Sequence, residues 1–161
     1  MKPLTSQEMT LQLAKELEKR DEQQVIAEMR GEIVRSWVYQ IQLGNRTVTN
    51  LSYAGVKEAI RRRGNLSTYP CSCCQKTVHV EETDSEIRAL VRVWDLNNNV
   101  EVLGASSAKK GPFDFVLAVN KAERNAWRKL LPEKQIALLI EQWLKGPEGP
   151  GEQKPPPGKL A

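Results

Sequence analysis

Apolar residues recur along this chain with two different periods, and these periods predict its strands and helices. Residues 86–95 alternate most clearly, with Ile87, Ala89, Val91 and Val93 on one side of a predicted strand and Arg88, Leu90, Arg92 and Trp94 on the other. Weaker alternation predicts strands at residues 32–42, 47–51, 77–81 and 100–105. Turn-forming residues at 43–46, 83–85 and 97–99 separate these strands, so we expect neighbouring strands to pair in antiparallel fashion.

Helical periodicity predicts four helices, at residues 5–30, 53–63, 113–132 and from Pro132 onward. Ser6, Ser52 and Asp114 are candidate N-caps. Gly31 and Gly64 are predicted to end the first and second helices. The order is helix, hairpin, helix, three-stranded β run, helix, helix. This order predicts an α+β fold, in which an antiparallel β-sheet has helices packed on one face.

The composition divides the chain into three predicted segments. Residues 1–31 form an N-terminal helical arm that can dock on its own subunit or on a neighbour, and residues 32–145 form the α+β domain. Residues 146–161 form a Pro/Gly-rich tail with too little apolar surface to order itself. No apolar run approaches the roughly 20 residues that a membrane span needs, and the N-terminus lacks a signal-peptide core. We therefore expect a cytoplasmic protein, nucleoid-associated if cellular, with no membrane partner.

The predicted helix at residues 113–132 has two faces. Its apolar stripe comprises Phe115, Val119, Ala122, Ala126 and Leu130, and we expect it to pack on the sheet. Its polar face carries Lys121, Arg124, Asn125 and Arg128, with Lys129 nearby. Such a face suits a polyanion. The alternative is an ordinary solvated helix whose basic residues match the macrodipole at its C-terminus.

Basic residues also gather elsewhere. The net charge of +4 is mild, so the location of the charges matters more than their amount. The further patches are Arg61, Arg62 and Arg63; Arg88 and Arg92, with Trp94 beside them; and Lys109 with Lys110. Each patch also has an explanation that involves no ligand. The three arginines can match the dipole at the C-terminus of their helix, and Arg88 and Arg92 can belong to an ordinary solvated sheet face. Proteins that bind single strands combine cations with flat side chains, so the set together favours nucleic-acid binding.

The sequence contains few residues in patterns that are typical of an active site. The single histidine, His79, has no nucleophile in a suitable context, and no phosphate-binding or dinucleotide-binding glycine motif occurs. We expect no enzyme activity, no small-molecule substrate and no cofactor. Cys71, Cys73 and Cys74 invite a zinc hypothesis with His79, but their spacing differs from the usual two pairs of ligands. The alternative, small apolar residues in a strand or loop, leads us to predict no metal site.

Four stretches resemble a known family. They are Asn-Leu-Ser-Tyr-Ala-Gly-Val-Lys-Glu at residues 50–58, Val-Arg-Val-Trp-Asp at 91–95, Glu-Val-Leu-Gly-Ala-Ser at 101–106 and Val-Asn-Lys-Ala-Glu-Arg-Asn-Ala-Trp-Arg-Lys-Leu-Leu-Pro at 119–132. In this order they resemble the single-strand annealing proteins of the Rad-fifty-two type, including phage and archaeal relatives. The resemblance covers about residues 32–132, and its last block is the most specific.

The resemblance implies a β-β-β-α core, homo-oligomeric rings, and single-stranded DNA held in a basic groove for annealing without ATP in recombination and repair. By position, Arg124 matches a basic residue of the family that contacts DNA and Arg128 matches the arginine that follows it, whereas Asn125 stands where a second basic residue is common. The cluster at 61–63 matches only loosely, and the cysteine segment has no counterpart. Two alternatives stay open: a module that binds or protects single-stranded DNA or RNA without annealing it, and a zinc-stabilised interaction protein.

Overall fold

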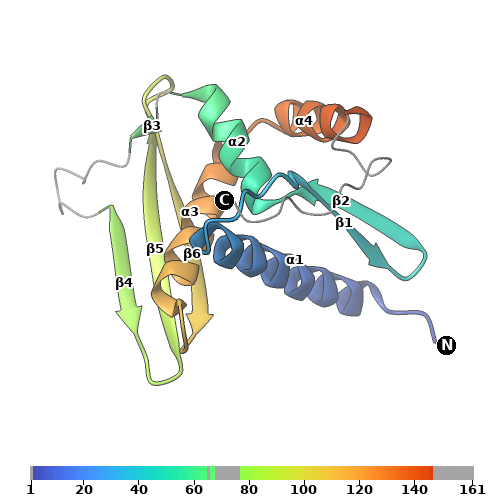
Figure 1. Cartoon of the computed structure of the whole chain (residues 1–161), viewed down its shortest axis with the longest axis horizontal. Helices are drawn as coiled ribbons and strands as arrows, with labels where there is room; N and C mark the ends of the chain where they lie inside the picture. The colour runs from blue at the N-terminus through green and yellow to red at the C-terminus, as the bar shows by residue number, and fades with distance from the viewer. Residues whose placement is uncertain (1, 65, 68–76, 147–161) are drawn as a thin grey trace. The chain divides into compact units, whose positions relative to one another are not determined.

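The computed structural model describes residues 2–64, 66–67 and 77–146 (Figure 1). The predicted α+β class is confirmed, since this part of the chain forms four helices and two antiparallel sheets. None of the helices in these ranges is both long and apolar enough to cross a membrane. The predicted disorder of the tail and the hypotheses on Cys71, Cys73 and Cys74 fall outside the described residues.

The described residues form two compact units. One comprises the chain up to Gly55 together with the chain from Ile136 onward, and the other runs from Val56 to Gln135. These boundaries differ from the predicted ones at residues 31 and 145. Helices α2 (Tyr53–Arg63) and α4 (Glu133–Lys145) each begin in one unit and end in the other.

The first unit contains helix α1 (Ser6–Met29) and a hairpin of strands β1 (Val38–Leu43) and β2 (Arg46–Leu51). The predicted N-cap of α1 at Ser6 is wrong by one residue. Thr5 is the cap, because its hydroxyl accepts from the Glu8 N–H at 3.1 Å while the Glu8 carboxylate accepts from the Thr5 N–H at 2.8 Å. This reciprocal pair satisfies two backbone donors at the helix start, and Ser6 cannot form it from within the helix.

Strand β1 begins later than predicted, because the backbone just before it bonds to other groups. The Ser36 carbonyl accepts from the Gln24 side chain at 2.9 Å and from the Ser52 hydroxyl at 2.6 Å. Within the hairpin, Tyr39, Ile41 and Leu43 are buried. Leu13 and Leu17 of α1 pack on these three residues. The predicted N-terminal arm therefore packs on the hairpin of its own chain.

Three of the predicted helix boundaries are confirmed in detail. Helix α2 starts where predicted, and the Ser52 hydroxyl accepts from the Gly55 N–H at 3.0 Å. Gly64, with a φ of +66°, follows its last residue, in the left-handed conformation that glycine adopts without strain. Helix α4 begins directly after Pro132, as predicted, and buries Ile136 and Leu139.

The second unit contains a sheet of strands β3 (Leu66–Ser67), β4 (Val78–Glu82), β5 (Glu86–Asp95) and β6 (Val100–Lys109). Strand β5 is central: β6 pairs along its whole length on one side, and β4 and β3 follow one another on its other side (Figure 1). All these pairs are antiparallel. Strand β6 extends beyond the predicted strand at residues 100–105, because residues 106–109 continue it and pair with residues 86–89 of β5.

Helix α3 (Asp114–Leu130) packs on β5 and β6. Ala122, Ala126 and Leu130 of the predicted apolar stripe are buried, but the stripe is wrong for Phe115, which is 53% exposed. The predicted N-cap is also wrong. Phe113 takes that place with a φ of +66°, while the Asp114 carboxylate accepts from the Phe115 N–H at 2.6 Å within the first turn.

The contact between α3 and β6 is very close at Gly104. A Cβ atom built on Gly104 would lie 2.0 Å from the Ala122 carbonyl oxygen and 2.4 Å from the Ala126 nitrogen. Since only a residue without a side chain fits, the helix backbone can lie directly against the strand. Small residues on both elements, with Ala118 the third buried alanine of α3, therefore set the distance between them.

Replacing Gly104 should destabilise the protein. We expect Gly104→Ala to lower the free energy of unfolding by about 1–3 kcal/mol or more, because backbone rather than a flexible side chain opposes the added methyl group. Gly111→Ala is the matched control, since no atom lies within 4 Å of its added Cβ. Chemical denaturation of the two variants checks this, and equal stabilities would contradict the close contact.

Candidate nucleic-acid interface

Three polar residues of α3 bond to the outer edge of β6. The Lys121 ammonium donates to the Ser107 carbonyl at 2.6 Å, and the Asn125 amide donates to the Ala105 carbonyl at 2.9 Å. Lys129 donates in the same way to the Leu103 carbonyl. The three donors are four residues apart on the helix, and the three acceptors are two residues apart on the strand. Because β5 pairs with the other side of β6, these bonds occupy carbonyls on the edge that faces away from β5.

This arrangement corrects the prediction for the polar face of α3. Lys121 was expected on an exposed basic face, but it is only 3% exposed and its ammonium is bonded to the sheet. A lysine can bury its aliphatic stem along a helix while its charged end reaches a polar group. Lys121, Asn125 and Lys129 therefore hold the helix on the edge of the sheet, where they also cover backbone groups that could pair with another strand.

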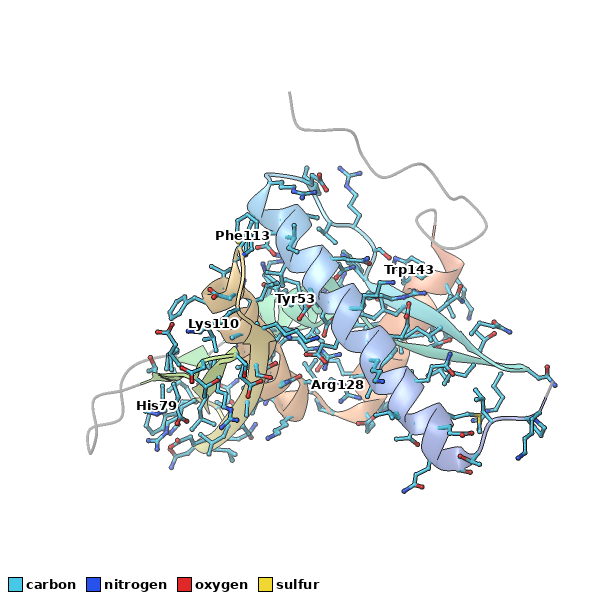
Figure 2. All side chains as sticks on the ribbon, turned by 90° about the horizontal axis from the view of Figure 1, so that it is seen from below. Tyr53, His79, Lys110, Phe113, Arg128 and Trp143 are labelled. Atoms are coloured by element: carbon cyan, nitrogen blue, oxygen red, sulfur yellow. The ribbon has the colours of Figure 1, made fainter. Side chains whose placement is uncertain are left out.

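The two arginines of α3 lie differently. Arg128, marked in Figure 2, forms an ion pair with Glu133 at 3.3 Å. Arg124 is half-buried, and its guanidinium lies 3.5 Å from the Asn125 side-chain oxygen. Both positions that the family resemblance singled out are thus engaged within the protein, and neither presents a fully exposed guanidinium.

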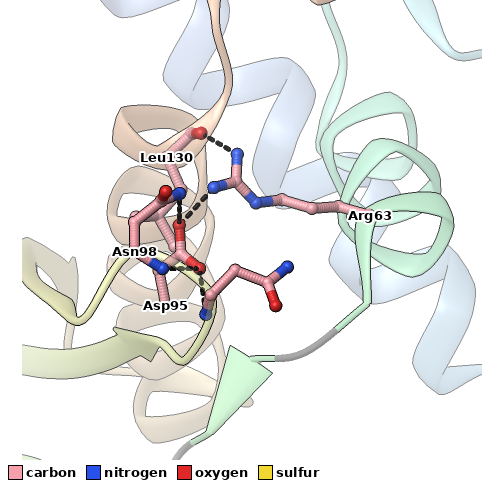
Figure 3. A network of polar contacts seen from close by, with 5 residues as sticks. Arg63, Asp95, Asn98 and Leu130 are labelled. Carbon is pink, nitrogen blue, oxygen red and sulfur yellow. Dashed lines mark hydrogen bonds and ion pairs between the residues drawn. The ribbon is translucent and has the colours of Figure 1, made fainter.

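Arg63 belongs to a partly buried network of polar contacts (Figure 3). Its guanidinium donates to the Leu130 carbonyl at 2.5 Å and forms an ion pair with Asp95, which is only 1% exposed. The Asp95 carboxylate also accepts from the Asn98 side chain at 2.8 Å and from the Asn97 N–H at 3.0 Å. The hydrogen bond from Asn98 and the charge of Arg63 hold the pKa of Asp95 below its ordinary value. Arg63 therefore joins the ends of α2, β5 and α3.

The other two arginines of this cluster lie on the surface of α2. Arg61 and Arg62 both form ion pairs with Glu58, at 2.6 and 3.0 Å. The hydrogen bond from Arg61 is the largest influence on Glu58, and the pKa of that carboxyl is lowered. The predicted patch at 61–63 thus consists of one structural arginine and two that share a carboxylate.

The sheet face opposite α3 has a different character. Arg88, Leu90, Arg92 and Trp94 alternate with the buried residues of β5, as predicted, and so point away from the helix. We call this surface the open sheet face. Strand register gives its further members: His79 and Glu81 on β4, Glu86 on β5, and Glu101, Leu103, Ala105, Ser107 and Lys109 on β6. In Figure 2 the labelled His79 lies on this side of the sheet.

An apolar strip crosses the open sheet face. Leu103, opposite Arg92 in the register, is 41% exposed, while Leu90 and Trp94 are half-buried. Within the described part of the second unit, α3 is the helix that packs on β5 and β6, and it lies on the other face. This face therefore offers exposed apolar surface from leucine and tryptophan in alternation with the charged ends of two arginines.

Carboxylates lie beside the cations of this face. Arg88 forms an ion pair with Glu86 at 2.7 Å, and Arg92 forms one with Glu101 at 3.5 Å. The hydrogen bond that Arg88 donates to the Glu86 carboxylate raises the pKa of Arg88. Lys110, which follows β6 and is labelled in Figure 2, pairs with Glu82 at 2.7 Å.

The structure thus gathers some predicted site residues and separates others. Arg88, Arg92, Trp94 and Lys109 share one surface, whereas the candidates on α2 and α3 serve packing or surface ion pairs. Sequence reasoning missed Leu103, Glu86 and Glu101 as members of the site. Alternation along residues 86–95 pointed to Glu86, but Leu103 and Glu101 required the register of β6 against β5.

Metal ligands do not gather in the described ranges. No group of three or more His, Cys, Asp or Glu side chains there is placed to hold a metal ion. His79 is exposed on β4. The cysteine segment lies outside these ranges, so neither the prediction of no metal site nor the alternative of a zinc site there is tested.

Comparison with known proteins adds little about function. No protein-family model matches the chain, and no solved structure matches it. The chain is similar to an uncharacterized protein of Methanocaldococcus jannaschii, with 29% identity over 97 residues. The match covers 57% of this chain and 38% of that protein, so the chain spans well under half of its relative.

The bond from Lys121 to the sheet predicts a stability effect. We expect Lys121→Ala to lower the free energy of unfolding by about 1–3 kcal/mol, because it leaves the Ser107 carbonyl without this donor. Lys134→Ala removes an exposed lysine of α4 and should change stability by less than about 0.5 kcal/mol. Urea denaturation of both variants checks this. Equal, small effects would contradict a structural role for Lys121.

The Arg63–Asp95 network predicts a dependence of stability on pH. Because the pKa of Asp95 is lower in the folded state, its contribution is complete above the ordinary pKa of about 3.9 and is lost as pH falls below it. Asp95→Asn should therefore be less stable than the wild type at pH 6, and the difference should shrink below about pH 4. Denaturation curves from pH 2.5 to 6 measure this, with exposed Asp84→Asn as control. A difference independent of pH would argue against the charged network.

Proposed function

We propose that this chain binds single-stranded DNA on the open sheet face and promotes annealing of complementary strands. The observation that carries the proposal is the accessible set of Leu90, Trp94 and Leu103, which alternates along β5 with Arg88 and Arg92. The rest of the proposal, including its part in recombination and repair, rests on the resemblance to annealing proteins.

The chemistry of the strip favours unpaired strands. Each contact between a base and an aromatic side chain contributes about 1–3 kcal/mol, and it needs a base whose flat face is accessible. In a duplex the base faces are covered by neighbouring bases, so Trp94 would have no comparable partner. Arg88 and Arg92 would meanwhile contact phosphates, which carry no sequence information. Binding of this kind tolerates any sequence, as annealing requires.

The topology also supports the proposal. Strands β4, β5 and β6 followed by α3 give the β-β-β-α order that the resemblance implies. The role of α3 is revised, because Lys121, Asn125 and Lys129 bond to the edge of β6 and hold the helix against it. In our proposal α3 keeps the sheet rigid, and the arginines and tryptophan on the opposite face contact the strand. Homo-oligomerisation, including a ring, remains part of the proposal.

Removing the cations or the tryptophan should weaken binding. Arg88→Ala and Arg92→Ala should each reduce the slope of log affinity against log salt by about one. Trp94→Ala should weaken binding by about 1–3 kcal/mol with a smaller change in slope. Fluorescence anisotropy with a labelled oligothymidylate measures these effects. Lys134→Ala removes a positive charge outside the sheet and serves as the matched control.

Two outcomes separate the proposal from its rivals. If the three sheet variants bind like Lys134→Ala, the open sheet face is not the binding surface. If the wild type binds single strands but slows the pairing of complementary oligonucleotides, the chain is a protecting module that does not anneal. Comparing oligothymidylate with oligouridylate tests whether it prefers DNA or RNA.

A further inference from the structure

We propose that Glu86 and Glu101 compete with phosphate for the arginines of the open sheet face and thereby set its affinity for single strands. This inference rests on the proposed function and concerns the same surface. It assigns a function to two acidic residues that are unexpected in a surface meant to bind a polyanion.

The geometry at Arg92 carries the argument furthest. Its guanidinium lies 3.5 Å from the Glu101 carboxylate, and both side chains are 32% exposed. Glu101 is the register partner of Trp94, so its carboxylate belongs to the same end of the apolar strip. A nucleotide whose base contacts Trp94 would bring its phosphate to the place that this carboxylate occupies. Arg92 can then exchange one anion for the other.

Arg88, two positions from Arg92 along the same face of β5, also lies beside a carboxylate. Glu86 lies 2.7 Å from its guanidinium, and the side chains are 58% exposed for Arg88 and 30% for Glu86. Glu81, opposite Arg88 in the register, adds a second negative charge. With Lys109 included, the described open sheet face carries three cations and three carboxylates: Arg88, Arg92 and Lys109 against Glu81, Glu86 and Glu101. Because these charges cancel, the face attracts a phosphate only weakly until a carboxylate moves away from its arginine.

Such an exchange is energetically easy. Ion pairs between partly exposed side chains contribute little to stability, since water and salt screen them. A phosphate can therefore displace the carboxylate, and the carboxylate stays tethered close by. When the phosphate leaves, the ion pair re-forms at once. The face should then bind strands reversibly, and annealing needs this because a paired strand must be released.

Neutralising the carboxylates tests the inference. We expect Glu101→Gln and Glu86→Gln each to bind a labelled oligothymidylate of about 20 nucleotides about two- to fivefold more tightly than the wild type. This is the change expected when one exposed ion pair no longer competes with the phosphate. Glu133→Gln is the matched control, because it removes a carboxylate that pairs with Arg128 outside the open sheet face. Its affinity should match that of the wild type.

A double variant separates competition from a general loss of negative charge. If Glu101 acts by masking Arg92, the gain from Glu101→Gln should disappear when Arg92 is already alanine. An equal gain in both backgrounds would overturn the inference. Wild-type affinity in Glu101→Gln and Glu86→Gln would also overturn the inference. If Arg92→Ala still weakened binding in that case, the proposed function would be retained without it. If the wild type and every variant fail to bind, the proposed function itself is wrong.

Discussion

Helix α3 lies so close to strand β6 that a Cβ on Gly104 would fall 2.0 Å from the Ala122 carbonyl oxygen. The rest of the second unit depends on this contact. Because the helix is near the strand, the side chains of Lys121, Asn125 and Lys129 can reach the carbonyls on the edge of β6. The small residues at the centre of the contact and the polar side chains beside it thus both hold α3 against β6.

The same contact decides which surface is available for function. With α3 on one face and its donors on the β6 edge, the opposite face of the sheet presents Leu90, Trp94 and Leu103 beside the two arginines. Positive charge on a helix is therefore a poor guide to function here. The lysines with the most regular spacing serve the fold, and the arginines on a strand form the proposed site. Their carboxylate partners make that site adjustable.

Much of the fold could be predicted from local sequence. Strand β5 and helix α2 have the predicted bounds, because alternation is unbroken in the first and Ser52 and Gly64 mark the ends of the second. The far half of β6 could not be found, since Ser106 to Lys109 has a weak pattern and is held by its pairing with β5. The burial of Lys121 was missed for a related reason. A lysine looks solvated until the carbonyl that binds it is known, and Ser107 lies on another element.

The most direct test of the central claim is a titration of the labelled protein with oligothymidylate, followed through the four tryptophan indole N–H signals in nitrogen–proton NMR spectra. Each tryptophan reports on a different element: Trp37 precedes β1, Trp94 lies on the open sheet face, Trp127 lies on α3 and Trp143 on α4. The account predicts that the signal of Trp94 shifts most and that backbone amides of β5 and β6 shift with it. A titration in which Trp127 and the amides of α3 respond while Trp94 stays unchanged would contradict it.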